Sequence, residues 1–164
     1  MSRTLLLLRH AKSSWKDESL SDHERPLNKR GQAAAPRMGR LIRDQGMVPD
    51  RILSSTAERA RATAEAVAEV CGYQGEITPL RDLYLAAPSA YVDVARAVEG
   101  DPASLLLVGH NPGINSLVRE LTGSDEVMPT AALARIELPI SRWSELDIDV
   151  RGELLGLWRP RELD

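Results

Sequence analysis

The sequence lacks the features that identify several classes of protein. Its 164 residues include one cysteine, Cys71, so no disulfide can form within the chain and a reducing cytoplasm is the expected compartment. No apolar run approaches the roughly 18 residues that span a bilayer. The first residues also lack the basic region, long apolar core and cleavage site of a signal peptide. We therefore expect no membrane segment and no secretion.

A dominant charge of one sign is also missing. The chain has 21 Lys and Arg against 24 Asp and Glu, a net charge of −3, with no long basic block. Nucleic-acid binders depend on clustered basic residues, so we expect no nucleic-acid partner and only a local cationic site. The length and the 43% of apolar residues fit one globular domain over residues 1–164.

Two short apolar runs, each followed by a histidine, organise the sequence. Leu5–Leu8 leads directly into Arg9 and His10, and Leu105–Val108 leads into His110 after one glycine. Runs that are apolar at every position are typical of parallel strands covered on both faces. Ligands of such sheets bind just past the carboxyl ends of the strands. The sequence therefore predicts that both histidines and Arg9 line one crevice.

The remaining elements alternate between helix and strand. Helices are expected from an Asn28 cap to Gly46, from a capping box at 55–58 to Gly72, after Pro88, and from an Asn111 cap to Gly123. Pro36, inside the first helix, predicts a kink or a late start. Strands are expected at 51–54, 76–78, 132–138 and 154–158, with a turn or brief helix at 80–84. This order predicts an α/β fold, a three-layer α/β/α sandwich with a mainly parallel central sheet.

Arg59 stands where helix stability does not favour an arginine. It falls in the first turn of the helix that follows the predicted capping box. That end of a helix carries partial positive charge, so an acidic residue would be the better structural choice. The position makes sense if an anion binds there, because free N–H groups and a guanidinium would converge on it. Arg61, slightly further on, fits a solvent-facing position better.

The side chains predicted at the strand ends favour phosphoryl chemistry. Arg9, Arg59, His10 and His110 combine two fixed cations with two imidazoles, without a cysteine cluster or a set of metal-ligating carboxylates. Guanidinium forks match phosphate oxygens, and phosphoryl transfer depends on positioning and charge stabilisation. A neutral imidazole nitrogen can also attack phosphorus and form a covalent intermediate. A non-catalytic phosphate-binding module is the alternative.

Three sequence patterns resemble the histidine phosphatase superfamily. They are Leu-Leu-Arg-His ending at His10, Ser54-Ser55 followed by the Arg-Ala-Arg-Ala-Thr-Ala-Glu of 59–65, and Val-Gly-His-Asn-Pro at 108–112. The short length, the Arg-His-Ala-Lys-Ser form at 9–13, the Arg-Pro-Leu at 25–27 and the Arg-Gly at 30–31 most resemble its small SixA-like phosphohistidine phosphatase branch.

The resemblance implies a phosphoglycerate-mutase-like fold, with a mixed sheet between two helical layers, and an enzyme without metal or cofactor. His10 would be the nucleophile that becomes phosphorylated. Arg9, Arg59 and His110 would hold the phosphoryl group, and Arg25 would add a further phosphate contact. The implied activity is hydrolysis of phosphohistidine in a partner protein, with a small phosphorylated metabolite as the alternative substrate.

Two departures from the superfamily pattern bear on the substrate. Ala11 stands where the superfamily usually has glycine. Members that act on phosphoesters carry a glutamate acid near 82–85, whereas residues 83–87 hold no acid here. An alcohol leaving group generally needs a positioned proton donor, so the missing acid favours phosphohistidine. The remaining candidates for a proton donor are Asp17, Asp22, His23, Glu24 and Asp82.

Overall fold

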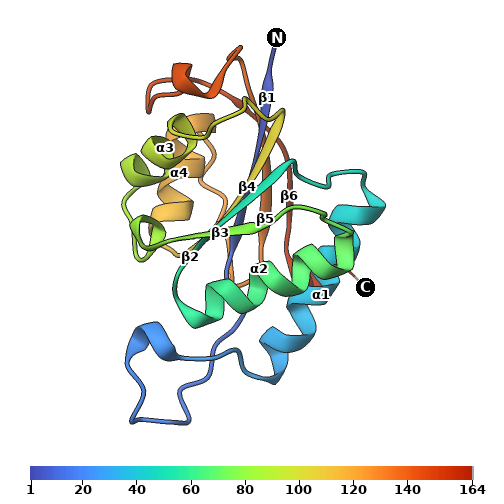
Figure 1. Ribbon diagram of the computed structural model, residues 1–164, viewed down its shortest axis with the longest axis vertical. Coiled ribbons are helices and arrows are strands. Elements are labelled where there is room, and N and C mark those ends of the chain that lie inside the picture. Colours follow the sequence, from blue (N-terminus) through green and yellow to red (C-terminus); the bar gives the residue numbers. More distant parts are fainter. Residues whose placement is uncertain (164) are drawn as a thin grey trace.

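The computed structural model describes residues 1–163 and has an α/β fold around one six-stranded sheet (Figure 1). The strands are β1 (Arg3–Arg9), β2 (Arg51–Ser55), β3 (Ile77–Leu80), β4 (Ser104–Gly109), β5 (Leu133–Leu138) and β6 (Glu153–Trp158). The helices are α1 (Lys29–Asp44), α2 (Glu58–Cys71), α3 (Pro88–Arg96) and α4 (Gly113–Thr122). Short 3-10 helices are η1 (Asp22–Glu24), η2 (Arg81–Leu83), η3 (Trp143–Glu145) and η4 (Pro160–Glu162).

The strand order is β3-β2-β4-β1-β5-β6. β1, β4, β2 and β3 are parallel neighbours, whereas β5 is antiparallel to β1 and β6 is antiparallel to β5. β6 therefore runs in the same direction as β1. The predicted mainly parallel, mixed sheet is confirmed, and the carboxyl ends of β1, β2, β4 and β6 lie along one edge.

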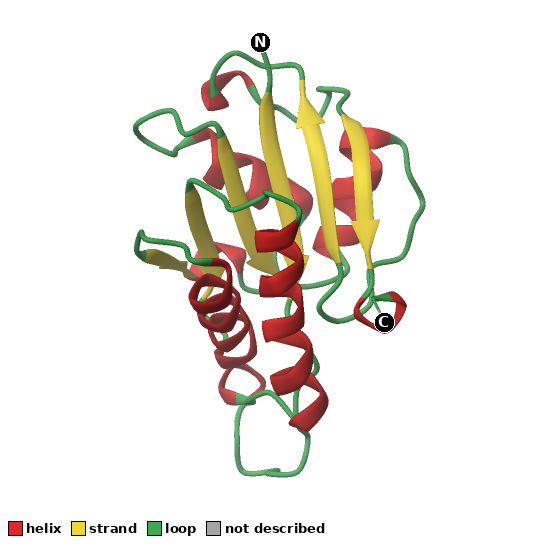
Figure 2. Ribbon diagram, turned by 90° about the vertical axis from the view of Figure 1, so that its right-hand side faces the viewer, coloured by secondary structure: helices red, strands yellow, loops and turns green. Residues whose placement is uncertain are grey.

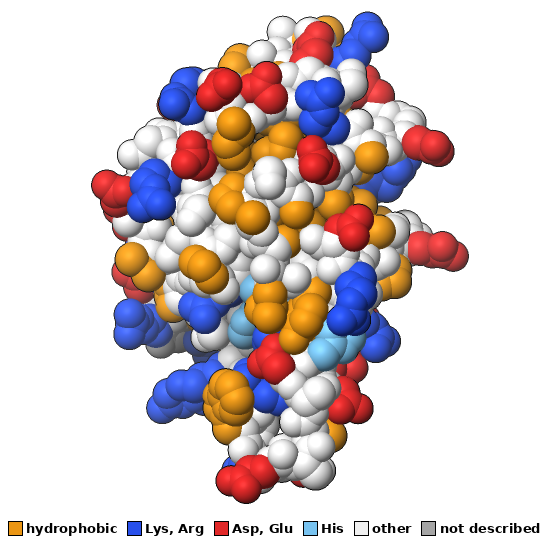
Figure 3. Space-filling model, turned by 90° about the vertical axis from the view of Figure 1, so that its left-hand side faces the viewer, with side chains coloured by type: hydrophobic (Ala, Val, Ile, Leu, Met, Phe, Trp, Pro, Cys, Tyr) orange, Lys and Arg blue, Asp and Glu red, His pale blue; other side chains and the backbone are white. Residues whose placement is uncertain are grey.

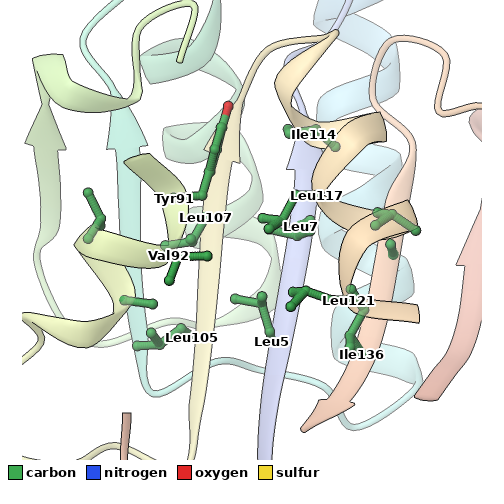
Figure 4. Packing of buried hydrophobic residues seen from close by; sticks show 14 of the residues in the cluster. Leu5, Leu7, Tyr91, Val92, Leu105, Leu107, Ile114, Leu117, Leu121 and Ile136 are labelled. Atoms are coloured by element: carbon green, nitrogen blue, oxygen red, sulfur yellow. The ribbon is translucent and has the colours of Figure 1, made fainter. Parts of the chain in front are cut away.

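The leucine run of β1 is apolar throughout because both faces of this strand are covered. Leu5 and Leu7 pack in one cluster with residues of α3 and α4, as Figure 4 shows. Leu6 and Leu8 pack on the other face with residues of α1 and α2, the two long helices in front of the sheet in Figure 2. All four side chains are at most 1% exposed, and burial of each stabilises the fold by roughly 1.5–3 kcal/mol. The three-layer arrangement is thus confirmed.

The predicted Asn28 cap of α1 is confirmed, but the predicted late start is not. The Asn28 side chain caps the helix, accepting a hydrogen bond from the backbone N–H of Gly31 at 2.9 Å. The helix then continues through Pro36 to Asp44, so the prediction of a late start is wrong.

Within residues 1–163, no helix is both long and apolar enough to cross a membrane.

Two predicted helix caps are wrong. Ser55 ends β2, and α2 begins at Glu58 with Ala57 at the cap position and no side-chain cap. The Ser55 hydroxyl accepts from the Ala57 N–H and contacts His110. α4 begins one residue later than expected, at Gly113. There the Asn111 side chain accepts from the backbone N–H of Asn115, within the first turn rather than at the cap position.

Candidate active site

His10 and His110 lie side by side. Their ring centroids are 5.1 Å apart with the planes tilted by 50°, and the residues are 7% and 1% exposed. The cause is the parallel pairing of β1 with β4, in which Arg9 lies opposite Gly109. The backbone N–H of His10 also donates to the Gly109 carbonyl at 3.0 Å. The structure therefore brings the two predicted histidines into one site at the carboxyl edge of the sheet.

His10 is held as a neutral imidazole. Burial lowers its pKa to about 4, and the charges of Arg59, Arg9 and Arg25 act in the same direction, against the opposing effect of a hydrogen bond to the Ala11 carbonyl. That bond joins Nδ1 to the carbonyl oxygen at 2.7 Å. A carbonyl only accepts, so in the neutral ring the proton belongs on Nδ1 and the lone pair on Nε2. Nε2 therefore carries the free lone pair of the ring.

His110 is held in the opposite tautomer. Its Nε2 lies 2.8 Å from the Ser55 hydroxyl and its Nδ1 lies 3.5 Å from Nη2 of Arg59. Because a guanidinium only donates, Nδ1 is the acceptor and Nε2–H donates to Ser55. Burial, followed by the nearby His10 and Arg59, lowers the His110 pKa to about 3. An anion in the site would oppose those effects and favour a protonated, donating ring.

Three arginines surround the histidines with unsatisfied donors. Arg25 and Arg59 are 7% and 3% exposed, and Arg9 is half-buried. Within residues 1–163, the buried Nε atoms of all three arginines have no hydrogen-bond partner. Burial, and then the charge of Arg59, lowers the pKa of both Arg9 and Arg25. Clustered buried cations with free donors are suited to an oxyanion that offsets their repulsion.

Asp22 is the acidic side chain that contacts this cluster. Its carboxylate lies 3.0 Å from Nη2 of Arg59 and 3.2 Å from Nη1 of Arg25, and it accepts a hydrogen bond from the Tyr84 hydroxyl at 2.5 Å. Burial alone would raise the pKa of Asp22, but the hydrogen bonds from Tyr84 and Arg59 and the two arginine charges hold it below its usual value. The carboxylate is therefore ionised at neutral pH and does not act as a proton donor.

The other candidate proton donors lie elsewhere or are already paired. His23 lies 2.8 Å from the Thr56 hydroxyl and meets Tyr84 edge-on at 4.8 Å. Asp17 and Glu24 are exposed, with their side chains bonded to Ser19 and Ser21. Asp82 lines a separate pocket between β3 and α3. Among the residues described, none of these four side chains forms a hydrogen bond with either catalytic candidate histidine.

Sequence reasoning missed three side chains of the site. The Tyr84 ring lies 5.5 Å from that of His110, and the Ser55 hydroxyl accepts a hydrogen bond from Nε2–H of His110. Trp15 is 74% exposed, yet its ring lies 3.4 Å from the Arg25 guanidinium carbon, which it covers. Ser55 could have been found, because it directly follows a predicted strand at the same sheet edge.

Ala11 fits the position where the superfamily usually has glycine. Its backbone does not adopt a positive φ, so a side chain adds no strain. Its N–H donates to the Thr63 hydroxyl at 2.9 Å, which ties the residue after His10 to α2. This departure therefore leaves the backbone at His10 unstrained.

A neutral imidazole among buried guanidinium groups, at the carboxyl edge of an α/β sheet, is suited to a tetrahedral oxyanion (Figure 3 shows histidine surface beside acidic and basic side chains). The chain belongs to the histidine phosphatase superfamily (branch 1), whose family model matches residues 5–84. Within the described part of the chain, no group of three or more His, Cys, Asp or Glu could hold a metal ion.

Relatives extend this similarity to most of the chain. The uncharacterised chloroplastic protein At3g52155 of Arabidopsis thaliana is 32% identical over 154 residues, covering 88% of this chain and 71% of its own. The crystal structure of the putative phosphohistidine phosphatase SixA from Agrobacterium tumefaciens is 30% identical with a TM-score of 0.82, covering 96% of this chain and 98% of that one. The superfamily and this fold support a phosphatase.

Proposed function

We propose that this chain, as one domain of residues 1–164, hydrolyses protein phosphohistidine through a covalent phosphate on His10. The observation that supports it most directly is the neutral His10 ring, with Nδ1 bonded to a carbonyl and Nε2 free among cationic side chains. A histidine held in this state at neutral pH is ready to attack phosphorus.

The reaction follows from the placement of these groups. Arg9, Arg25, Arg59 and His110 hold the phosphoryl oxygens. Nε2 of His10 forms a bond to phosphorus while the P–N bond of the substrate breaks. The substrate imidazole, already protonated on its other ring nitrogen, departs as a neutral ring, and His10 keeps its proton on Nδ1. Water then attacks phospho-His10, the second P–N bond breaks, and inorganic phosphate leaves with His10 neutral again. The arginines stabilise the charge that develops on the equatorial oxygens in both steps.

The protonation states around the site favour a P–N bond over a phosphoester. The carboxylate in contact with the site, Asp22, is held ionised by its lowered pKa, and the Tyr84 hydroxyl beside it has a raised pKa. An alkoxide leaving group would need a positioned acid, whereas a protonated imidazole leaves readily. The name of the Agrobacterium relative, a putative phosphohistidine phosphatase, agrees with this substrate class.

The donor set also supports catalysis without a metal or cofactor. The groups that face the proposed phosphoryl position are guanidinium and imidazole donors, which neutralise a dianion directly. We expect EDTA to leave turnover unchanged, and loss of activity restored by a divalent cation would contradict this part of the proposal. The expected partner is a phosphorylated protein, and a cytoplasmic location stays a prediction.

The decisive experiment uses a protein carrying radiolabelled phosphohistidine, with rapid quenching to trap label on the enzyme. We expect label on wild-type protein, release of phosphate, and loss of both in His10→Ala. His23→Ala serves as the matched control and should still become labelled. Faster turnover of a sugar phosphate panel would instead identify a metabolite phosphatase. Tight phosphate binding with no label and no turnover would identify a non-catalytic binding module.

A further inference from the structure

A basic pocket lies next to the proposed active site. Its cavity of about 620 Å³ is lined by Lys12, Arg30, Arg37 and Arg161, together with Pro129, Thr130 and other small or apolar residues. No acidic side chain is among the described residues that line it. The chain as a whole has a net charge of −3, so this concentration of positive charge is local.

The sheet topology places the pocket on the same edge as His10. Lys12 lies two residues past His10, and η4, which supplies Arg161, follows the carboxyl end of β6 (Figure 1). A short wall, residues 128–131, borders both sites. The Ala131 N–H donates to the carbonyls of Arg9 and His10, at 3.1 and 3.0 Å. The adjoining residues of this wall line the pocket.

The four cations of the pocket have no acidic partner among the residues that the structure describes. Within residues 1–163, none of them lies within 4.0 Å of a carboxylate oxygen, whereas many other arginines of the chain form such pairs. Arg37 donates to the carbonyl oxygen of Pro160 at 3.3 Å, which connects α1 to η4 across the pocket. Gathered like charges repel one another, and an anionic ligand would offset that repulsion.

We propose that this pocket binds acidic side chains that flank the phosphohistidine of a protein substrate, an inference that rests on the function proposed above. Lys12, two residues past His10, lines the pocket beside the wall of residues 128–131, so a ligand that fills both sites must extend beyond the phosphoryl group. An extended polypeptide does this with successive residues about 3.3 Å apart, whereas a compact phosphate ester does not. The pocket thus selects among phosphorylated proteins by the charge beside the modified residue.

The test compares two phosphohistidine peptides that differ only in their flanks, one acidic and one with the matching amides. For the double variant Arg30→Gln, Arg161→Gln we expect the KM of the acidic peptide to rise about tenfold, with kcat and the KM of the amide peptide nearly unchanged. Added salt should raise the wild-type KM for the acidic peptide alone. Arg119→Gln on α4, across the sheet, removes one positive charge from an exposed side chain and should change neither KM.

A charge-reversal variant should reverse the preference between acidic and basic flanks. It thereby distinguishes a charge effect from a loss of activity toward every peptide. Arg161→Glu should improve the KM of a peptide with lysine flanks while it worsens that of the acidic peptide. Equal changes for all peptides, or none, would overturn the proposal.

Direct binding separates failure of this inference from failure of the proposed function. Fluorescence anisotropy of the unphosphorylated acidic peptide should show affinity that the double variant loses. If that binding is present but no phosphohistidine substrate turns over, the pocket assignment holds and the proposed function fails. Turnover without charge-dependent binding would refute the pocket assignment and leave the proposed function standing. Stronger binding of an oligonucleotide than of the acidic peptide would do the same.

Discussion

Replacement of Arg59 by alanine is the sharpest test of the oxyanion site. Arg59 is 3% exposed in the first turn of α2, and its Nε has no partner within the described residues. A guanidinium so placed contributes little to folding unless an anion binds. We therefore expect Arg59→Ala to separate activity from stability.

The expected loss of transition-state stabilisation is several times larger than the expected loss of folding stability. Loss of one preorganised donor to developing negative charge costs about 10²–10³ in kcat, or roughly 3–4 kcal/mol. The folded state of the variant lacks the hydrogen bonds from Arg59 to Asp22, at 2.7 Å to its carbonyl oxygen and 3.0 Å to a carboxylate whose side chain is 41% exposed. Such a pair stabilises a protein by about 1 kcal/mol or less, and removal of Arg59 also relieves its repulsion of Arg9 and Arg25.

The assay measures kcat and KM on a phosphohistidine protein, together with thermal unfolding in the presence and absence of phosphate. Arg59→Ala should lower the melting temperature in phosphate-free buffer by about 4 °C or less and lose the stabilisation that phosphate gives. Arg61→Ala is the matched control, because Arg61 lies on the same helix but is exposed and pairs with glutamates. Turnover of Arg59→Ala within threefold of the wild type would refute the assignment.

Three further predictions follow from the geometry of the histidines. Because protonation removes the His10 lone pair, kcat/KM should hold down to mildly acidic pH and fall as pH approaches the His10 pKa of about 4, as a pH–rate profile will show. An acid limb near pH 6.5 would contradict the buried, neutral ring. The unfolded chain binds more protons than the native chain between pH 6.5 and about 4, so stability should fall across this window as pH is lowered, by about 3 kcal/mol for His10. Urea unfolding in phosphate-free buffer measures this loss, and a flat profile would contradict it. Gly109→Ala should destabilise the fold by about 1–3 kcal/mol and reduce activity, because a Cβ there would overlap the buried Tyr91 hydroxyl that receives the His110 N–H; unchanged unfolding and turnover would count against that interaction.

The sequence by itself determined the architecture and the centre of the site. Leucine at every position of 5–8 requires cover on both faces, which only a central strand of a layered sheet provides. Two such runs ending in histidines had to place His10 and His110 at one edge, once the strands were parallel neighbours. These inferences depend on local periodicity and strand direction, which a sequence carries directly.

Tertiary structure alone decided which loop residues complete the site. Asp22 and Tyr84 are 62 positions apart, and nothing in their local sequence shows that they share a hydrogen bond beside Arg59. Ser55 matched a helix cap locally, but its hydroxyl is engaged with His110, which follows another strand, β4. The protonation states of both histidines were equally hidden, since burial and the charges of distant arginines set them. Long-range contacts fix these features, because the free energy of a polar side chain depends on the partners that folding brings to it.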